Sequence, residues 1–317
     1  MSRIYGTKEG SLSFSSGNQG RLELTRNYHI QAYNCKLSVN HTNTSASFKD
    51  EDLLSLITNL QIVANGDETI KSVPASKFHI DNIMFSGRKG LQSVDKADGT
   101  KDSYVYFTVY FSIPNTLRPY DTIFNTAVYS TLNMLVNWGT ASNVATGIVI
   151  NSASLDVYSH ALTNYSRNAD EKIKHYKETY LKKDITVTSN ALTIDLPTKH
   201  LYKSFAVAST VNGVRVDTVI NKITIKSGTT VIVQLDADEI KAFNYSAYEV
   251  NDVADINGIY VIDFLSRGKM SDLLDTFSQF NTLEMVLDVT KKTGTNELHV
   301  YSDIIDIKNA VEVSSKQ

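Results

Sequence analysis

A short apolar motif occurs twice in this chain, and it constrains the fold more than any other feature of the sequence. Residues 155–159 read Leu-Asp-Val-Tyr-Ser, and residues 298–302 read Leu-His-Val-Tyr-Ser. Each copy predicts a β-strand in which Leu, Val and Ser face one way and the residues between them face the other. Because roughly one such match is expected by chance among the many window pairs of a chain this long, the motif alone carries little weight.

Two further signals precede each copy in the same order. Thr-Leu-Asn-Met at 131–134 matches Thr-Leu-Glu-Met at 282–285. Further upstream, three isoleucine or leucine residues lead into a turn in both halves: Ile57, Leu60 and Ile62 before Asn65-Gly66, and Ile220, Ile223 and Ile225 before Ser227-Gly228. Three signals in one order indicate that a single structural unit has been used twice.

The rest of the pattern predicts how the units are divided. We expect an N-terminal arm over 1–25, a first unit over 26–164, a connector helix over 165–183, a second unit over 184–310 and a C-terminal tail over 311–317. The arm is rich in Ser, Gly and Asn without a visible period, so it is either a mobile tail or a segment that orders against a neighbouring subunit or an anionic surface. The connector is predicted because Ile173, Tyr176 and Tyr180 fall at helical spacing among Lys and Glu residues.

Both units predict an antiparallel β-fold. Val, Ile, Thr, Tyr and Phe dominate the apolar runs, and turns recur every dozen or so residues, which favours a sandwich or barrel over a parallel α/β sheet. Short helices are expected over 75–85, from Asp236 through Tyr248, and over 271–280, with Phe78 and Phe243 at similar places in the first two. The predicted fold class is all-β: two tandem eight-stranded antiparallel jelly-roll barrels with short helices and a helical connector.

Composition excludes several classes of protein. The net charge is −3, so no global attraction to nucleic acid is expected. The single cysteine, Cys35, excludes an intrachain disulfide. The first residues lack the apolar core of a signal peptide, and the longest apolar run, 104–113, is too short to cross a bilayer. We therefore expect a chain that is made and folded in a cytoplasm.

The search for catalytic or metal-binding chemistry finds no constellation. None of the seven histidines forms an HxH or HxxxH pair, and no GxSxG, Walker or GxGxxG motif occurs. The other candidates have plainer interpretations: a buried structural thiol for Cys35, a solvated loop rather than a calcium site for Asp95, Asp98 and Asp102, helix-terminal groups for Asp81, Asp236, Asp238 and Glu239, and a core or interface position for Trp138. We predict no catalytic residue, no cofactor and no metal site, and no enzymatic activity.

Residues 26–310, with their repeated strands, their turn-then-helix segments and their connector, resemble the double jelly-roll major capsid proteins of tailless icosahedral bacteriophages that contain a membrane. The length and short loops are similar to the corticovirus coat protein and, more closely, to that of the Flavobacterium-infecting lipid-containing phage. The resemblance implies a virion protein, assembled in the host cytoplasm, whose homotrimers form pseudo-hexagonal capsomers around an internal membrane and genome. It also implies contacts with neighbouring capsomers, with penton or minor capsid proteins and, through the N-terminal arm, with the viral membrane, but no sequence-specific nucleic acid.

Two other functions fit the same sequence. A tandem β-sandwich carbohydrate-binding protein or adhesin would be a monomer or fibre with an exposed aromatic or calcium-loaded loop. A hydrolase built on paired jelly rolls would carry coupled carboxylates of shifted pKa in a cleft between the units.

Overall fold

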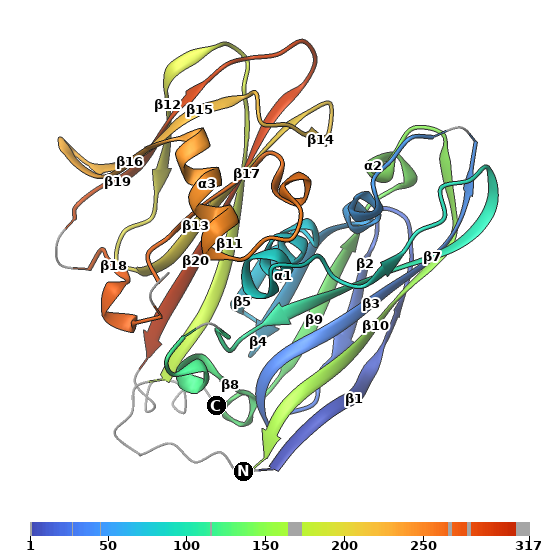
Figure 1. The fold of residues 1–317 in the computed structure, drawn as a ribbon. Helices are drawn as coiled ribbons and strands as arrows, with labels where there is room; N and C mark the ends of the chain where they lie inside the picture. Colours follow the sequence, from blue (N-terminus) through green and yellow to red (C-terminus); the bar gives the residue numbers. More distant parts are fainter. Residues whose placement is uncertain are drawn as a thin grey trace.

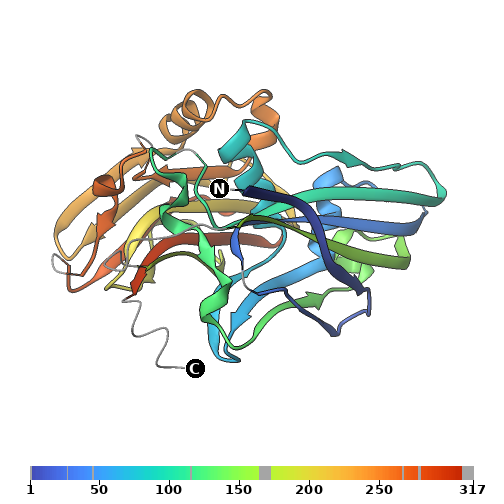
Figure 2. The same ribbon diagram turned by 90° about the horizontal axis from the view of Figure 1, so that it is seen from below.

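The computed structural model describes residues 2–26, 28–44, 46–114, 116–163, 173–265, 268–277 and 280–308. Two β-sandwiches lie side by side, with helix α1 between them (Figure 1). Figure 2 shows the same pair from below, with the first unit in blue to green and the second in yellow to red. In the described part of the chain, no helix has the length and apolar character needed to cross a membrane.

The first sandwich is built from ten strands: β1 (Ser2–Ser13), β2 (Gln19–Glu23), β3 (His29–Asn43), β4 (Ile57–Ala64), β5 (Glu68–Val73), β6 (Gln92–Ser93), β7 (Gly99–Tyr110), β8 (Phe124–Asn125), β9 (Leu132–Trp138) and β10 (Ile148–Thr163). One sheet has the order β1-β10-β3-β7-β6, with β8 added to β3, and the facing strands run β2-β9-β4-β5. The helical segments are η1 (Asp50–Leu56), α1 (Ser76–Ser86), η2 (Pro119–Thr122), η3 (Thr126–Val128) and α2 (Ala141–Val144).

The second sandwich also has ten strands: β11 (Ile173–Asp184), β12 (Ser189–Leu196), β13 (Leu201–Val211), β14 (Val214–Arg215), β15 (Ile220–Ser227), β16 (Thr230–Asp236), β17 (Ile259–Asp263), β18 (Leu274–Asp275), β19 (Leu283–Val289) and β20 (Asn296–Lys308). β11, β20 and β13 pair in that order, β17, β14 and β18 pair with β13, and the other sheet runs β12-β19-β15-β16. The helical segments are α3 (Ala237–Ala247), η4 (Val253–Ile256) and η5 (Met270–Asp272).

The two sandwiches repeat one topology. The order β1-β10-β3-β7 returns as β11-β20-β13-β17, and β2-β9-β4-β5 returns as β12-β19-β15-β16. In each unit these eight strands form two facing sheets of four, and the chain crosses from one sheet to the other after every strand except at the hairpins β4-β5 and β15-β16, which is the jelly-roll arrangement. The predicted fold class is confirmed: the chain is all-β, with two tandem antiparallel jelly rolls.

The repeat extends to strand register. Met134 of β9 lies opposite Ile62 of β4, and Met285 of β19 lies opposite Ile225 of β15. The Leu-x-Val-Tyr-Ser copies lie on the equivalent strands β10 and β20, and their Leu and Val side chains are at most 2% exposed. All three sequence signals therefore mark core positions that the two units share.

Local sequence explains the segments on which the repeat depends. Asn65 and Gly66 have φ of 51° and 85°, the left-handed conformation that a tight hairpin between β4 and β5 needs. Helix α3 begins with a capping box, because the Glu239 side chain accepts a hydrogen bond of 3.0 Å from the backbone N–H of Asp236. The predicted helices at 75–85 and 236–248 are confirmed as α1 and α3.

The predicted N-terminal arm is wrong. The described residues of 1–25 include β1 and β2, the first strands of the two sheets in the first jelly roll. β1 is an edge strand held by backbone pairing to β10, with register shifts near Gly6 and Gly10. Polar residues and bulges at an edge hide the alternation that marks an interior strand, so no strand period is visible in residues 1–25.

The predicted connector helix is also wrong, because residues 173–184 form strand β11. Tyr176 and Tyr180 are four residues apart, which fits one face of a helix and equally one face of a strand, and tertiary pairing with β20 decides the outcome. Residues 165–172 lie outside the described part, as does the tail at 311–317, so the predicted ends of the units at 164 and 310 stay predictions.

Two smaller expectations fail as well. Within 271–280 the described chain forms part of a single 3-10 turn and then β18, not a helix, and residues 278–279 lie outside the described part. Phe243 is 51% exposed, whereas Phe78 is fully buried, so the two helices do not use their phenylalanines alike.

The shared core positions lead to a matched test of stability. Leu155→Ala and Leu298→Ala remove equivalent side chains that are 0% exposed, so each should lower the free energy of unfolding by about 2–5 kcal/mol. Leu117→Ala, at a residue that is 74% exposed, should change it by less than about 0.5 kcal/mol. Denaturant unfolding at one fixed protein concentration measures all three, and a Leu298→Ala variant as stable as Leu117→Ala would contradict the equivalence.

Candidate functional site: the joint between the two jelly rolls

The two jelly rolls are fused along one strand edge and one helix. β11 runs parallel to β5, with Glu178 opposite Lys71, and so joins strands of both units into one ten-stranded sheet. Outward-facing Ala206, Ala208 and Tyr301 of the second unit pack in the same hydrophobic cluster as Phe78 of α1. We call this contact the intrachain joint: β5 and α1 of the first unit against β11, β20, β13 and β17 of the second.

A cluster of buried charges lies at the centre of the intrachain joint. The Nζ atom of Lys71 is 2.8 Å from a carboxylate oxygen of Glu178. The Nζ atom of Lys77 pairs with Asp81 one turn along α1, and lies 3.3 Å from Glu178 and 3.1 Å from Asp303. Every one of these side chains is at most 5% exposed. The ion pairs therefore link β5 and α1 to β11 and β20 in a region without contact to bulk water.

Neighbouring groups complete the cluster. The Nζ atom of Lys71 lies 3.6 Å from the ring centroid of Tyr176, a cation–π distance. The Ser204 hydroxyl donates to Asp303 over 2.6 Å. On the side toward α3, Lys203 pairs with Asp263 at 3.3 Å, and Asp263 also accepts a hydrogen bond from the Tyr248 hydroxyl.

Burial also changes the proton affinity of the cluster. It raises the pKa of Asp81 well above its usual range, which favours the protonated form of this carboxyl. Burial alone would also raise the pKa of Glu178, but Lys71 and Lys77 lower it to about 2. Two lysines, Lys71 and Lys77, lie among the carboxyl groups of Asp81, Glu178 and Asp303, so a raised pKa at Asp81 lowers the excess of negative charge in the cluster. An uncompensated buried charge would carry a large cost.

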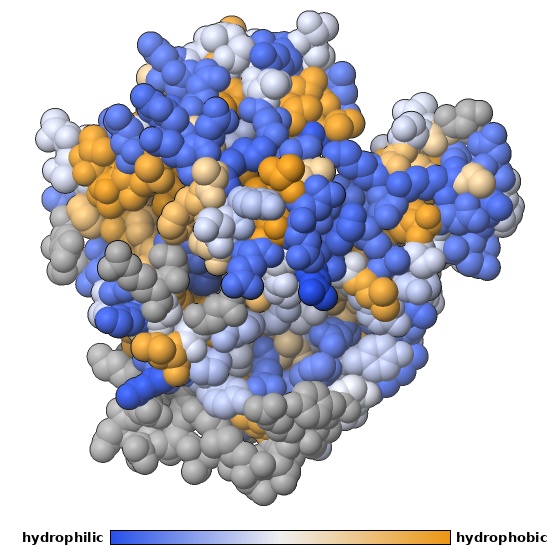
Figure 3. Space-filling model, in the orientation of Figure 1, coloured by the Kyte–Doolittle hydropathy of each residue, from blue (hydrophilic) through white to orange (hydrophobic). Residues whose placement is uncertain are grey.

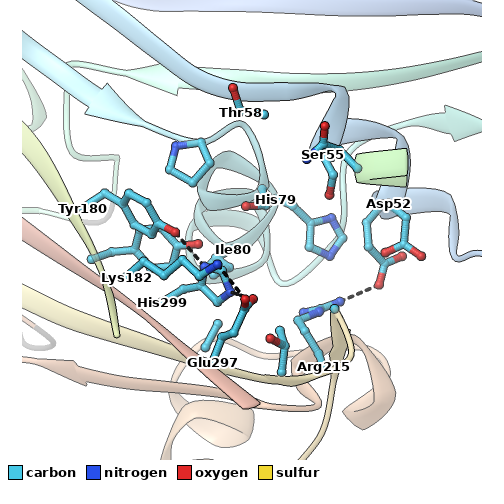
Figure 4. A pocket seen from close by; sticks show the side chains of 18 of the residues that line it. Asp52, Ser55, Thr58, His79, Ile80, Tyr180, Lys182, Arg215, Glu297 and His299 are labelled. Carbon is cyan, nitrogen blue, oxygen red and sulfur yellow. Dashed lines mark hydrogen bonds and ion pairs between the residues drawn. The ribbon is translucent and has the colours of Figure 1, made fainter. Parts of the chain in front are cut away.

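A pocket of about 380 Å³ opens beside the cluster, between the two units (Figure 4). His79 of α1 points into it from one side, and Tyr180, Lys182, Glu297 and His299 from β11 and β20 line the other. The pocket matches the position that the hydrolase alternative requires, a cleft between the jelly rolls.

The ionisable groups of the pocket are engaged in structural contacts. Although burial would raise it, the charge of Arg215 lowers the pKa of Glu51 to about 2, through an ion pair of 2.5 Å that crosses from one unit to the other. Asp52 accepts a hydrogen bond from the Lys49 backbone N–H at the start of η1. Burial, assisted by Arg215, lowers the pKa of His79 to about 3, so its imidazole is neutral. The shifted pKa values thus come from burial and from an ion pair that closes the joint.

The structure disperses the histidines rather than clustering them. His41 contacts Ser103, His160 contacts Asn34, His175 contacts Tyr129 and His299 contacts Tyr180. His29 lies on β3 and His200 just before β13. Among the described residues, no group of three or more His, Cys, Asp or Glu side chains is arranged to hold a metal ion.

The other candidates fall mostly where the sequence predicts. Cys35 is buried in β3, and burial raises the pKa of its thiol far above the physiological range, so a structural role is supported. Trp138 is 2% exposed and packs edge-on against Phe14, so it belongs to the core. Asp95 pairs with Lys101, and Asp102 accepts from Asn40.

The prediction that Asp81 is a helix-terminal group is wrong, and the residues that pair with it were not predicted. It lies in the middle of α1, in the buried cluster, and not at a helix end. Lys77 and Asp81 have the i,i+4 spacing of a helical ion pair, which the sequence offered as a signal. Glu178 could not be found this way, because its segment is a strand and its lysine partners lie about a hundred residues earlier in the chain.

Comparisons with known proteins agree with this architecture. No family model and no curated protein matches the sequence. Among solved structures, the major capsid protein of Sulfolobus turreted icosahedral virus aligns with a TM-score of 0.77 at 14% identity, over 99% of this chain and 100% of that one. The major capsid protein of bacteriophage PM2 aligns with a TM-score of 0.65 at 9% identity, over 98% and 99%. The PBCV-1 virus capsid aligns with a TM-score of 0.60 at 12% identity, over 96% and 93%.

The chain has the double jelly-roll fold. The solved structures that share it are major capsid proteins of icosahedral viruses, and at these identities the likeness shows the fold alone. In this double jelly roll, the intrachain joint is the feature that sets the position of one barrel-like unit against the other.

The cluster predicts strong sensitivity to loss of one cation. Lys77→Ala leaves the carboxyl groups of Asp81, Glu178 and Asp303 without their shared partner, so the free energy of unfolding should fall by about 3–5 kcal/mol. Lys101→Ala breaks a partly exposed pair with Asp95 and should cost about 0–1 kcal/mol. Denaturant unfolding of the two variants makes the comparison, and equal costs would show that the cluster does not hold the joint.

Glu178 also predicts a pH dependence. Its pKa is about 2 in the folded chain and about 4.3 when unfolded, so the stability it contributes is present above pH ~4.3 and is lost as pH falls toward 2. Glu178→Gln should remove this component, which amounts to about 3 kcal/mol over that window. Glu23→Gln, at an exposed position on β2, should follow the wild-type curve. Unfolding free energies measured at steps from pH 5 to pH 2 would contradict the assignment if Glu178→Gln kept the wild-type slope.

Proposed function

We propose that this protein is a major capsid protein whose trimers form pseudo-hexagonal capsomers of an icosahedral shell. The observation that carries the proposal is the pair of equivalent jelly rolls held at a fixed relative position by a joint with buried ion pairs. Support also comes from the solved structures with this fold, which are coat proteins of icosahedral viruses.

The architecture suits a shell built from one gene product. A closed ring of identical subunits with head-to-tail contacts needs two different faces on each subunit. Two similar but non-identical jelly rolls in one chain supply them, and three chains then present six similar lobes. A fixed joint keeps the lobes in the geometry that neighbouring capsomers require.

The wider assembly is part of the same proposal. The capsomers would contact one another and penton or minor capsid proteins, and would enclose an internal membrane and genome in a virion assembled in the host cytoplasm. The protein would be structural and not an enzyme, and would read no nucleic-acid sequence. Contact of an N-terminal arm with the membrane is not proposed, because residues 2–23 include β1 and β2 of the first jelly roll.

Solution mass and particle shape test the proposal. Light scattering should give three times the 35.2 kDa of the chain, and electron microscopy of the same sample should show a ring with six lobes. A monomer at all concentrations would argue against a capsomer. A monomer that also binds on a glycan array would favour the carbohydrate-binding alternative.

A further inference from the structure

Two strand edges are left open at the positions equivalent to the intrachain joint. Within the chain, β5 of the first unit meets β11 of the second. The equivalents are β16 in the second unit and β1 in the first, and among the described strands each pairs on one side only, β16 with β15 and β1 with β10. β1 and β16 lie on opposite sides of the molecule in Figure 1. The chain therefore carries both halves of a second joint, placed too far apart to meet each other.

The helices of the two units differ in the same way: α1 is covered by the other unit, whereas α3 is partly exposed. α1 and α3 are both 11 residues long, and each follows the equivalent strand, β5 or β16. In α1, the eight successive residues from Lys77 to Met84 are buried, because the second unit covers the helix. In α3, Phe243 is 51% exposed and Tyr245 is 46% exposed, and Val231 of the adjacent β16 is 52% exposed. Figure 3 shows apolar surface gathered on this side of the second unit, over β16 and α3.

The first jelly roll has a hollow where the second jelly roll holds α1. In the joint, the sheet positions around α1 include Ala206, Val261 and Asp303. Strand register places Asn34, Thr108 and His160 at the equivalent positions of the first unit. All three line an open hollow of about 470 Å³. An open hollow thus lies on the outer face of the β1-β10-β3-β7 sheet, at the position equivalent to the one that α1 covers in the second unit.

Charge complements this shape. Lys77, the second residue of α1, meets the acidic Glu178 and Asp303 of its sheet face. The second residue of α3 is acidic, Asp238, followed by Glu239.

The sheet face that would receive α3 carries basic and aromatic side chains. Lys36 lies over the Tyr104 ring at 5.1 Å, and Lys8 over the Tyr158 ring at 6.0 Å. Tyr158 occupies the position equivalent to Tyr301 of the intrachain joint. Lys8 also pairs with Asp156 on this face at 2.9 Å. These three charged side chains leave one excess positive charge, and α3 begins with two acidic residues, so the charges are reversed relative to the intrachain joint, where a lysine of the helix meets acidic groups of the sheet.

We propose that the outer face of the β1-β10-β3-β7 sheet is the docking surface for α3 and the β16 edge of a second copy of this chain. Asp238 of one copy then reaches His160 of the next, as Lys77 reaches Asp303 within the chain, and β16 lies along β1 as β5 lies along β11. This inference rests on the proposed ring of three chains and identifies the contact that closes it.

Cross-linking tests the predicted neighbours directly. Two copies are mixed, one with Asp238→Cys and one with His160→Cys, and are oxidised mildly; the native Cys35 is 0% exposed and stays out of reach. The expected result is a disulfide-linked pair of chains. Val187→Cys, at a residue 65% exposed in the loop between β11 and β12, replaces Asp238→Cys in the matched control and should give no cross-link with His160→Cys.

Surface variants test the energetics. Phe243→Asp with Tyr245→Asp should weaken trimer formation by at least about tenfold at equal protein concentration, with an unchanged circular dichroism spectrum, because both residues are exposed in the single chain. Val187→Asp, at similar exposure, should leave the trimer intact.

The outcomes separate the inference from the proposed function. A trimer that gives no Asp238–His160 cross-link and tolerates the α3 variants would overturn this docking surface and leave the coat-protein proposal standing. A wild-type chain that stays monomeric would overturn both.

Discussion

Neutralisation of the buried charges at the intrachain joint is the constraint on which the rest of the structure depends. Lys71, Lys77, Glu178 and Asp303 have no access to water, so each requires a partner at short range. The partners come from β5 and α1 on one side and from β11 and β20 on the other. Because a shift of one unit against the other would leave a charge unpaired, the cluster favours one relative position. An apolar contact of the same area would tolerate sliding much better.

The two faces of each strand have separate roles in this chain. The residues that reveal the duplication, such as Leu155 and Leu298, point into the two cores and have kept their character and register. The alternate residues point outward and have diverged: His160 in the first unit corresponds to Asp303 in the second. Core positions are limited by packing, whereas outward positions are set by whatever covers that sheet. The same topology can therefore present one face to its own chain and a different face to a neighbour.

The fold could be predicted from the sequence because the core positions repeat. Segments whose structure depends on distant partners were predicted wrongly. Alternating apolar residues and the Asn65-Gly66 turn are local signals, so most interior strands and helices α1 and α3 were predicted. β1 needs no apolar alternation, since it is an edge strand held by backbone pairing to β10. β11 was predicted as a helix because the spacing of Tyr176 and Tyr180 fits one face of a helix as well as one face of a strand. The buried cluster was missed for the same reason. Lys71 and Glu178 meet only after both units have folded, and nothing in either segment alone indicates a partner.

The intrachain joint and the proposed contact between chains differ in burial and charge because they form at different times. The intrachain joint forms as the chain folds, so it can bury its charged groups almost completely. A contact between chains has to be exposed to water first and still be soluble. Tyrosines such as Tyr104 and Tyr158 meet this requirement, since the ring offers contact area while the hydroxyl stays hydrated. In the proposed contact, the acidic start of α3 would be repelled by Glu178 and Asp303 on the face that receives α1, and attracted by Lys36 on the other face. In the proposed trimer, covalent linkage and this difference in charge would make the two kinds of joint alternate around a ring, so that three identical chains give six similar lobes.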